Sequence, residues 1–116
     1  MRPESALQRL IRRHLDLRGF DSVAVPNGAV LAGDSIKKAR QMASLKADGL
    51  LPGFPDLLVY ARGGRIGHIE VKTPKGRVQP SQRQCQAWLE SIGHHYAICR
   101  SIEDVDKALA NWGWIV

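Results

Sequence analysis

The sequence has few cysteines and few aromatic residues. Of its 116 residues, two are cysteines and 6% are aromatic. Cys85 and Cys99 permit one disulfide, but a chain of this length buries enough surface to form a core without covalent staples. Both cysteines have apolar neighbours, which is typical of small core residues. We therefore predict two buried free thiols and a reducing environment.

Long apolar runs and low-complexity tracts are also missing. No run approaches the roughly 20 residues that a membrane helix needs, and the charged N-terminal stretch lacks the apolar segment of a signal peptide. The composition, 44% hydrophobic and 24% charged, is that of an ordinary globular protein. Because no repeat or linker is visible, we expect one domain over residues 1–116 and a cytoplasmic location.

Acidic residues are in the minority. The chain has 17 Lys and Arg residues against 11 Asp and Glu, a net charge of +6. The excess is uneven, since residues 62–83 contain six basic residues and a single acid, Glu70. A basic surface of this kind attracts polyanions, nucleic acid first. A basic pI is common, however, and does not by itself establish nucleic-acid binding.

The hydrophobic pattern predicts alternating helices and strands. Apolar spacing predicts a helix over residues 4–18, with Leu7, Leu10, Ile11, His14 and Leu15 on one face. Further helices are expected over residues 35–48, over 81–92 and from Ser101 onward. Strands are expected over residues 22–25, 56–61, 66–72 and 95–99, with turns at Pro26-Asn27-Gly28 and Arg62-Gly63-Gly64-Arg65. A hairpin followed by a strand–helix–strand crossover implies an α/β fold with a mixed sheet flanked by helices.

The predicted hairpin over residues 56–72 contains a candidate catalytic group. Glu70 and Lys72 lie two residues apart on one strand and therefore share a face, which His68 also shares. If the strands pair across the Gly-Gly turn, Asp56 becomes their neighbour. Carboxylates are preferred ligands of hard divalent ions, and a lysine beside such an ion can orient water or stabilise developing charge. A Glu-x-Lys pair taken alone is more often a plain salt bridge than a catalytic pair. His68 either contacts a substrate or fills the cleft.

Several short motifs follow one another along the chain. They are Gly53-Phe54-Pro55-Asp56, Glu70-Val71-Lys72, Pro80-Ser81-Gln82 and Arg100-Ser101, preceded by Glu4 and Gln8-Arg9 in the first helix. In this order they resemble the PD-(D/E)XK nuclease superfamily, and more narrowly its virus-type replication–repair nuclease (VRR-NUC) domain. The resemblance covers essentially the whole chain. It implies a restriction-endonuclease-like core of order α-β-β-β-α-β, with an extra helix.

The resemblance also implies a metal site. Asp56 and Glu70 would hold Mg²⁺ or Mn²⁺, with the carbonyl of Val71 as a third ligand. Glu4 would approach from the first helix and hold a second metal or its water, although an acid in a first turn also simply complements the helix dipole. Asp56 has the alternative role of capping a turn after Pro55.

Lys72 would then be the catalytic lysine, and Gln82 would reach the site from the start of its helix. Gln82 is also an ordinary polar residue for a helix start. The resemblance places Asn27-Gly28 close to the cleft. Six basic residues are expected to grip the DNA backbone: Lys75, Arg77, Arg83, Lys37, Lys38 and Arg40.

The expected function is that of a metal-dependent DNA endonuclease that hydrolyses phosphodiester bonds. No base-reading motif is visible, so selectivity for DNA shape is expected. If about five phosphates are neutralised, log affinity should fall with log salt at a slope near −4 to −5. The chain resembles stand-alone phage members, which implies a homodimer acting inside a host cell on branched DNA such as four-way (Holliday) junctions.

Three alternatives stay open at this point. The first is a non-catalytic nucleic-acid-binding module of the same fold. The second is a nuclease of different selectivity, cutting flaps, single strands or a specific sequence. The third is an interaction protein, supported only by the tryptophan-containing C-terminal tail. Trp88 and Trp114 are the candidate partner contacts.

Overall fold

The computed structural model describes residues 2–26 and 31–116. Along this chain eight elements follow one another: α1 (Pro3–Leu17), β1 (Asp21–Ala24), α2 (Ser35–Ala47), β2 (Leu57–Ala61), β3 (Arg65–Val71), α3 (Pro80–Ser91), β4 (His95–Cys99) and α4 (Ile102–Asn111). The predicted elements are all found, with ends that differ by one residue or less where a range was predicted. The predicted turn at Asn27-Gly28 lies outside the described residues.

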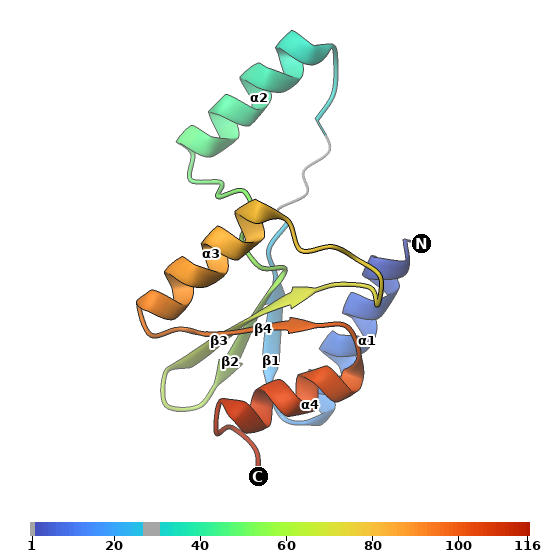
Figure 1. The fold of residues 1–116 in the computed structure, drawn as a ribbon, viewed down its shortest axis with the longest axis vertical. Coiled ribbons are helices and arrows are strands. Elements are labelled where there is room, and N and C mark those ends of the chain that lie inside the picture. The colour runs from blue at the N-terminus through green and yellow to red at the C-terminus, as the bar shows by residue number, and fades with distance from the viewer. Residues whose placement is uncertain (1, 27–30) are drawn as a thin grey trace.

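The four strands form one mixed sheet of order β1-β2-β3-β4 (Figure 1). β1 pairs antiparallel with β2, β2 pairs antiparallel with β3, and β3 pairs parallel with β4. The hairpin turn uses Gly63 and Gly64, both at positive φ, a conformation that glycine adopts without steric cost. The α3 crossover makes the parallel pairing possible, because two parallel strands cannot be joined by a tight turn. The predicted α/β class is confirmed.

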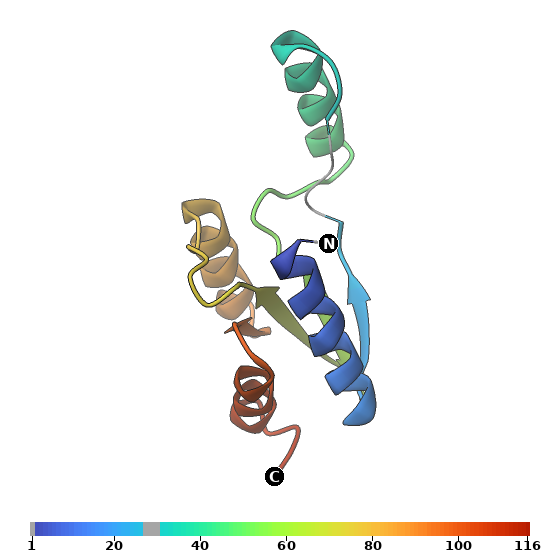
Figure 2. The same ribbon diagram turned by 90° about the vertical axis from the view of Figure 1, so that its right-hand side faces the viewer.

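Helices cover both faces of the sheet. On one face, Ile11 and Leu15 of α1 and Leu109 of α4 join the main core, while on the other face Cys85 and Leu89 of α3 form a smaller cluster. α1 and α3 accordingly lie on opposite sides of the sheet in Figure 2. The C-terminal half of β3 is therefore buried on both sides, which removes water from the strand that carries Glu70.

α2 stands apart from this body. It extends away from the sheet in both views (Figures 1 and 2) and contacts no other helix or strand in the described chain. None of its residues is buried, and the side chain of Ile36 is 65% exposed. Its start is capped by Asp34, whose carboxylate accepts a hydrogen bond from the backbone N–H of Lys37 at 2.9 Å.

Three expectations about packing need correction. Leu10 is 57% exposed, because α1 buries a narrower stripe than its apolar spacing indicates. Trp114 is not an exposed partner contact: it is buried, and its ring packs on Phe20 with centroids 5.7 Å apart. His14 lies at the edge of the core rather than within it, and its Nε2 is 2.8 Å from Oδ1 of Asp106 on α4.

Two further expectations concern cysteines and membranes. Both cysteines are free and buried, as predicted. Burial raises the pKa of Cys99 to about 12, so this thiol is inert. Among the described helices, none has the length and apolar character needed to cross a membrane.

Candidate active site

The hairpin register brings Asp56 and Glu70 together. Leu57 pairs with Ile69, so the residues just beyond this pair, Asp56 and Glu70, lie side by side where β2 begins and β3 ends. Oδ2 of Asp56 accepts a hydrogen bond from the backbone N–H of Val71 at 2.7 Å. The backbone carbonyl of Asp56 accepts a hydrogen bond from the backbone N–H of Val25 at 2.8 Å, which extends the pairing of β1 and β2. The position of Asp56 is thus fixed by both neighbouring strands.

Glu70 is a buried carboxyl group. It is 2% exposed, and one of its oxygens, Oε1, has no hydrogen-bond partner among residues 2–26 and 31–116. Burial raises its pKa to about 9, and the hydrogen-bonded carboxyl of Asp56 adds to this shift. An unpaired buried carboxyl is costly and is expected to find a cation or stay protonated. The arrangement therefore favours a positively charged ligand between the two carboxyl groups.

Lys72 follows β3 and shares the face of Glu70. It is 8% exposed, and its backbone N–H donates to the carbonyl of Cys99 at 3.0 Å, so the β3–β4 pairing continues through it. Its positive charge lowers the pKa of Glu70, which opposes the effects of burial and Asp56. A lysine so deeply placed beside two carboxyl groups is suited to act on a group bound there.

Gln82 reaches the same carboxyl group from α3. Its Nε2 donates to Oε2 of Glu70 at 3.2 Å, while its Oε1 accepts from the backbone N–H of Gln79 at 2.8 Å. Gln79 is the N-cap of α3, so the hydrogen bond at the helix start orients the amide and points its NH₂ group at Glu70. The two roles left open for Gln82 are therefore combined in one side chain.

Gly53, the first residue of the Gly-Phe-Pro-Asp motif, lies against the start of α3. It has a φ of +84°, and a Cβ at this position would lie 2.4 Å from the carbonyl carbon of Ser81 and 2.8 Å from the backbone nitrogen of Gln82. Only glycine permits this close approach of backbone to backbone. The contact sets the distance between the segment that leads to Asp56 and the helix that carries Gln82. In the sequence, Gly53 is visible only as part of the Gly-Phe-Pro-Asp motif. Its place two residues before Pro55 is the signal that the sequence offers for this contact.

Two further residues, Glu4 and Val71, are predicted metal ligands besides Asp56 and Glu70. Glu4 is exposed at the start of α1, near enough for its charge to raise the pKa of Glu70. In the described part of the chain, no three His, Cys, Asp or Glu side chains are arranged to hold one metal ion, so Glu4 does not complete a three-carboxylate site. Val71 is the last residue of β3, and its backbone N–H donates to Asp56. A site of two carboxylates and one carbonyl still suits Mg²⁺ or Mn²⁺, which usually retain several waters.

The six predicted DNA-binding residues fall into two groups. Lys75 and Arg77 are exposed on the segment after Lys72, and Arg83 is exposed on α3, next to Gln82. The other three, Lys37, Lys38 and Arg40, are exposed on α2 and are not brought into contact with the site.

His68 fills space and is closed to a substrate. It is 2% exposed, its ring packs edge-on against Phe54, and its Nε2 lies 2.9 Å from Nδ1 of His94. Burial and the neighbouring His94 lower its pKa to about 4, so it is neutral at physiological pH. Of the two roles considered for His68, the structure supports cleft filling.

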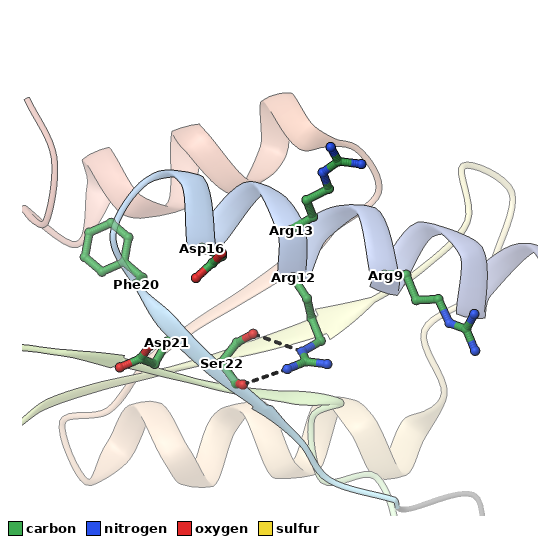
Figure 3. A pocket seen from close by; sticks show the side chains of 7 residues that line it. All are labelled: Arg9, Arg12, Arg13, Asp16, Phe20, Asp21 and Ser22. Carbon is green, nitrogen blue, oxygen red and sulfur yellow. Dashed lines mark hydrogen bonds between the residues drawn. The ribbon is translucent and has the colours of Figure 1, made fainter.

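A separate pocket of about 410 Å³ lies between α1 and β1, away from the carboxyl pair (Figure 3). Three arginines line it: Arg9, Arg12 and Arg13, whose spacing of three and four residues places them on one flank of α1. Arg12 donates from Nε to Oγ of Ser22 and from Nη2 to its carbonyl, both at 3.2 Å. Two acids share this pocket, Asp16 and Asp21, and none of its lining residues belongs to the predicted site.

Comparison with known proteins decides the family. The family model of the VRR-NUC domain matches residues 2–103. The chain belongs to the VRR-NUC family. This is a nuclease-type family, as the order of motifs indicated. No curated protein matches the chain significantly.

Two solved structures share the VRR-NUC fold. One, described as a VRR_NUC domain, has a TM-score of 0.64 and 20% sequence identity, and the match covers 94% of this chain and 96% of the other. The second, described as a VRR_NUC domain protein, has a TM-score of 0.63 and 18% identity, with 97% and 88% covered. At these identities the likeness concerns the fold, and the site has to be argued from this chain's own residues.

Proposed function

We propose that this VRR-NUC chain is a metal-dependent DNA endonuclease that hydrolyses phosphodiester bonds, with a preference for branched DNA such as four-way junctions. The observation that carries the proposal is the placement of Asp56, Glu70 and Lys72 at one end of the hairpin, with an unpaired buried oxygen on Glu70. A non-catalytic binding module would have no use for a carboxyl group buried at this cost.

Asp56 and Glu70 would hold the metal, with the Val71 carbonyl beside them. When bound, Mg²⁺ or Mn²⁺ supplies charge neutralisation on the phosphate and activation of a water molecule. The donor set fits such an ion, because the Oε1 atom of Glu70 lacks any other partner.

Other residues of the chain would orient Glu70, act on the phosphate and bind the DNA. Gln82 holds one oxygen of Glu70 by its hydrogen bond and leaves the other oxygen free. Lys72 presents an ammonium group on the same face, where it orients the attacking water or stabilises the charge that develops on the phosphate. Lys75, Arg77 and Arg83 lie exposed around this point and bind the DNA backbone as phosphate contacts, which carry no sequence information.

We also propose that two copies of the chain associate. A 13-residue helix that packs on nothing else is only marginally stable in water, and α2 contacts no other helix or strand in the part of the chain that the structure describes. A partner surface would stabilise it. A two-fold symmetric dimer would present two active sites to a two-fold symmetric junction, and the basic side of α2 (Lys37, Lys38 and Arg40) would then extend the DNA-binding surface.

The test is cleavage of a labelled four-way junction beside a linear duplex and a flap. Each substrate is incubated with Mg²⁺, Mn²⁺ or EDTA, using the native chain, Lys72→Ala and the control Lys107→Ala on α4. We expect metal-dependent paired nicks on the junction that are lost only in Lys72→Ala. Cleavage restricted to flaps or single strands would retain the active site and overturn the junction preference. Binding without cleavage under either metal would overturn the proposed activity.

A further inference from the structure

Arg100 lies directly after β4, the strand that pairs with β3. Its side chain turns back across the sheet edge to the segment that follows Lys72. There its Nη1 donates to the carbonyl oxygens of Thr73 and Gly76, both at 2.7 Å, and of Pro74 at 3.3 Å. One guanidinium group therefore binds three carbonyls of a single turn, although 24 or more residues separate it from each of them in sequence.

This turn lies beside the stem of Lys72. The backbone N–H of Gly76 donates to the carbonyl of Thr73 at 3.0 Å, which closes the turn. A Cβ on Gly76 would lie 3.4 Å from Cδ of Lys72, so even the smallest side chain at this position would meet the lysine stem. The turn also carries Lys75, one of the exposed basic residues near the site.

Arg100 is itself held in place. Its backbone N–H donates to Oδ2 of Asp104 at 2.8 Å, and the backbone N–H of Asp104 donates to Oγ of Ser101 at 3.1 Å. Ser101 is the N-cap of α4, so the cap fixes the backbone from which the arginine projects. All three bonds to the turn come from Nη1, which carries two hydrogens, so the longest bond, to Pro74, shares a hydrogen with one of the two shorter bonds.

We propose that Arg100 is the positioning residue of the catalytic lysine. By holding the 73–76 turn against the stem of Lys72, it fixes the ammonium group relative to Asp56 and Glu70 and places Lys75 beside the DNA. The inference rests on the proposed nuclease function. Arg100 acts through the turn and does not touch the reacting phosphate. It also gives a physical reason for the Arg-Ser motif: the arginine binds the turn, and the serine caps the helix that supports it.

The experiment compares Arg100→Gln and Arg100→Lys with Lys107→Gln. Lys107 lies on α4 and lines the same cavity as Arg100, so its substitution removes one positive charge from the lining of that cavity. For each variant, kcat and KM on cleavable DNA, the thermal midpoint and the rate of tryptic cleavage at the Lys75–Gly76 bond are measured. Tryptic cleavage reports opening of the turn without requiring catalysis.

We expect Arg100→Gln to lower kcat by about 10- to 100-fold, the scale of a misplaced catalytic group, with KM changed little. Tryptic cleavage at Lys75–Gly76 should accelerate, Arg100→Lys should recover part of kcat, and Lys107→Gln should resemble the native chain. A merely structural role would instead lower the thermal midpoint and leave kcat of the folded fraction intact, and this result would overturn the proposal.

The experiment distinguishes failure of the proposed nuclease function from failure of the proposed role of Arg100. If the native chain cleaves no DNA with either metal, the proposed function is wrong. If the native chain cleaves and Arg100→Gln cleaves equally fast with a protected turn, only the role of Arg100 is wrong.

Discussion

At the scale of single residues, Glu70 links stability to function. Its carboxyl group is buried beside Asp56 and its pKa is raised to about 9. Between the ordinary carboxyl pKa and about 9, the folded state keeps a proton that the unfolded state releases. The unfolded state therefore binds fewer protons in this window, and the free energy of unfolding falls as pH rises. Below the ordinary carboxyl pKa both states are protonated, and this contribution vanishes.

We expect Glu70→Gln to be more stable than the native chain in EDTA at pH 8, by at least about 1 kcal/mol, because the neutral amide avoids the cost of keeping a proton that the unfolded state releases. The difference should shrink as pH is lowered toward 4. Urea unfolding at several pH values measures it, with the exposed Glu90→Gln on α3 as a control that should show no pH-dependent difference. A stability difference that does not depend on pH would contradict the burial argument. Glu70→Gln should also lose any rise in thermal midpoint that Mn²⁺ gives the native chain.

Gly53 and Gly63 offer a matched pair of substitutions. Both have positive φ, +84° and +81°, but a Cβ would collide with the backbone of Ser81 and Gln82 at Gly53 and meet nothing within 4 Å at Gly63. We expect Gly63→Ala to cost about 1 kcal/mol from backbone strain alone. Gly53→Ala should cost at least about 3 kcal/mol, the range of severe core defects, because the start of α3 must move.

Urea unfolding gives both values, and cleavage assays give the functional consequence. Because the movement of α3 displaces Gln82 from Glu70, residual activity of folded Gly53→Ala should be reduced while that of Gly63→Ala is retained. Equal destabilisation by the two substitutions would show that the close backbone contact is unimportant.

The sequence predicted which residues lie together at the candidate site, but it did not predict the contacts that support them. Asp56, Glu70, Lys72 and Gln82 could be located because strand periodicity and motif order place them on one face and at one helix start. The supporting contacts could not be predicted. The carbonyls that Arg100 binds, and the backbone that Gly53 approaches, are distant in sequence, and backbone groups leave no residue-type signature. Glu4 was located on the correct helix, but its exposed position does not complete a cluster of three ligands.

At the scale of elements, α1 and α4 are joined by a charged contact that the sequence did not reveal. Asp106 on α4 accepts from Nε2 of His14 at 2.8 Å, lies opposite Arg18 at 3.1 Å and 3.2 Å, and has a pKa lowered by these partners. The helices themselves were predicted because each has an amphipathic period. Their pairing depends on the sheet because both helices pack into the core on the same face of it, which brings residues 92 positions apart together.

We expect Asp106→Asn to destabilise the chain at pH 7 by about 0.2–1 kcal/mol, the range of partly exposed ion pairs. Because the pKa of Asp106 is lowered in the folded state, its contribution is present above the ordinary Asp value and is lost as pH falls through the lowered one. Thermal unfolding at pH 7 and below pH 3 measures the difference. Asp16→Asn, at an exposed position of α1, is the control. A loss of the same size at both pH values would show that packing of the side chain matters rather than its charge.

At the scale of the whole molecule, the chain exposes two apolar features: the helix α2 and a surface around Trp88 and Leu51. α2 presents Ile36, 65% exposed, and contacts no other element of the described chain. Trp88 on α3 and Leu51 in the segment before β2 have side chains that are 47% and 43% exposed. Both residues line two cavities of about 330 and 390 Å³. We propose that α2 of one copy docks in the apolar groove of the other, and that the reciprocal contact closes a symmetric dimer.

The native chain should therefore have twice the 12.9 kDa mass of the monomer in light scattering at tens of micromolar. Ile36→Glu places a charge in the contact and should give a monomer, whereas Ser44→Glu, on the same helix and also exposed, should remain dimeric. Since only a dimer presents two active sites to one junction, the monomeric variant should nick the two strands independently while its rate per active site on linear DNA is retained. A monomeric native chain that makes paired nicks in a single binding event would overturn this account and require a second active site from another source.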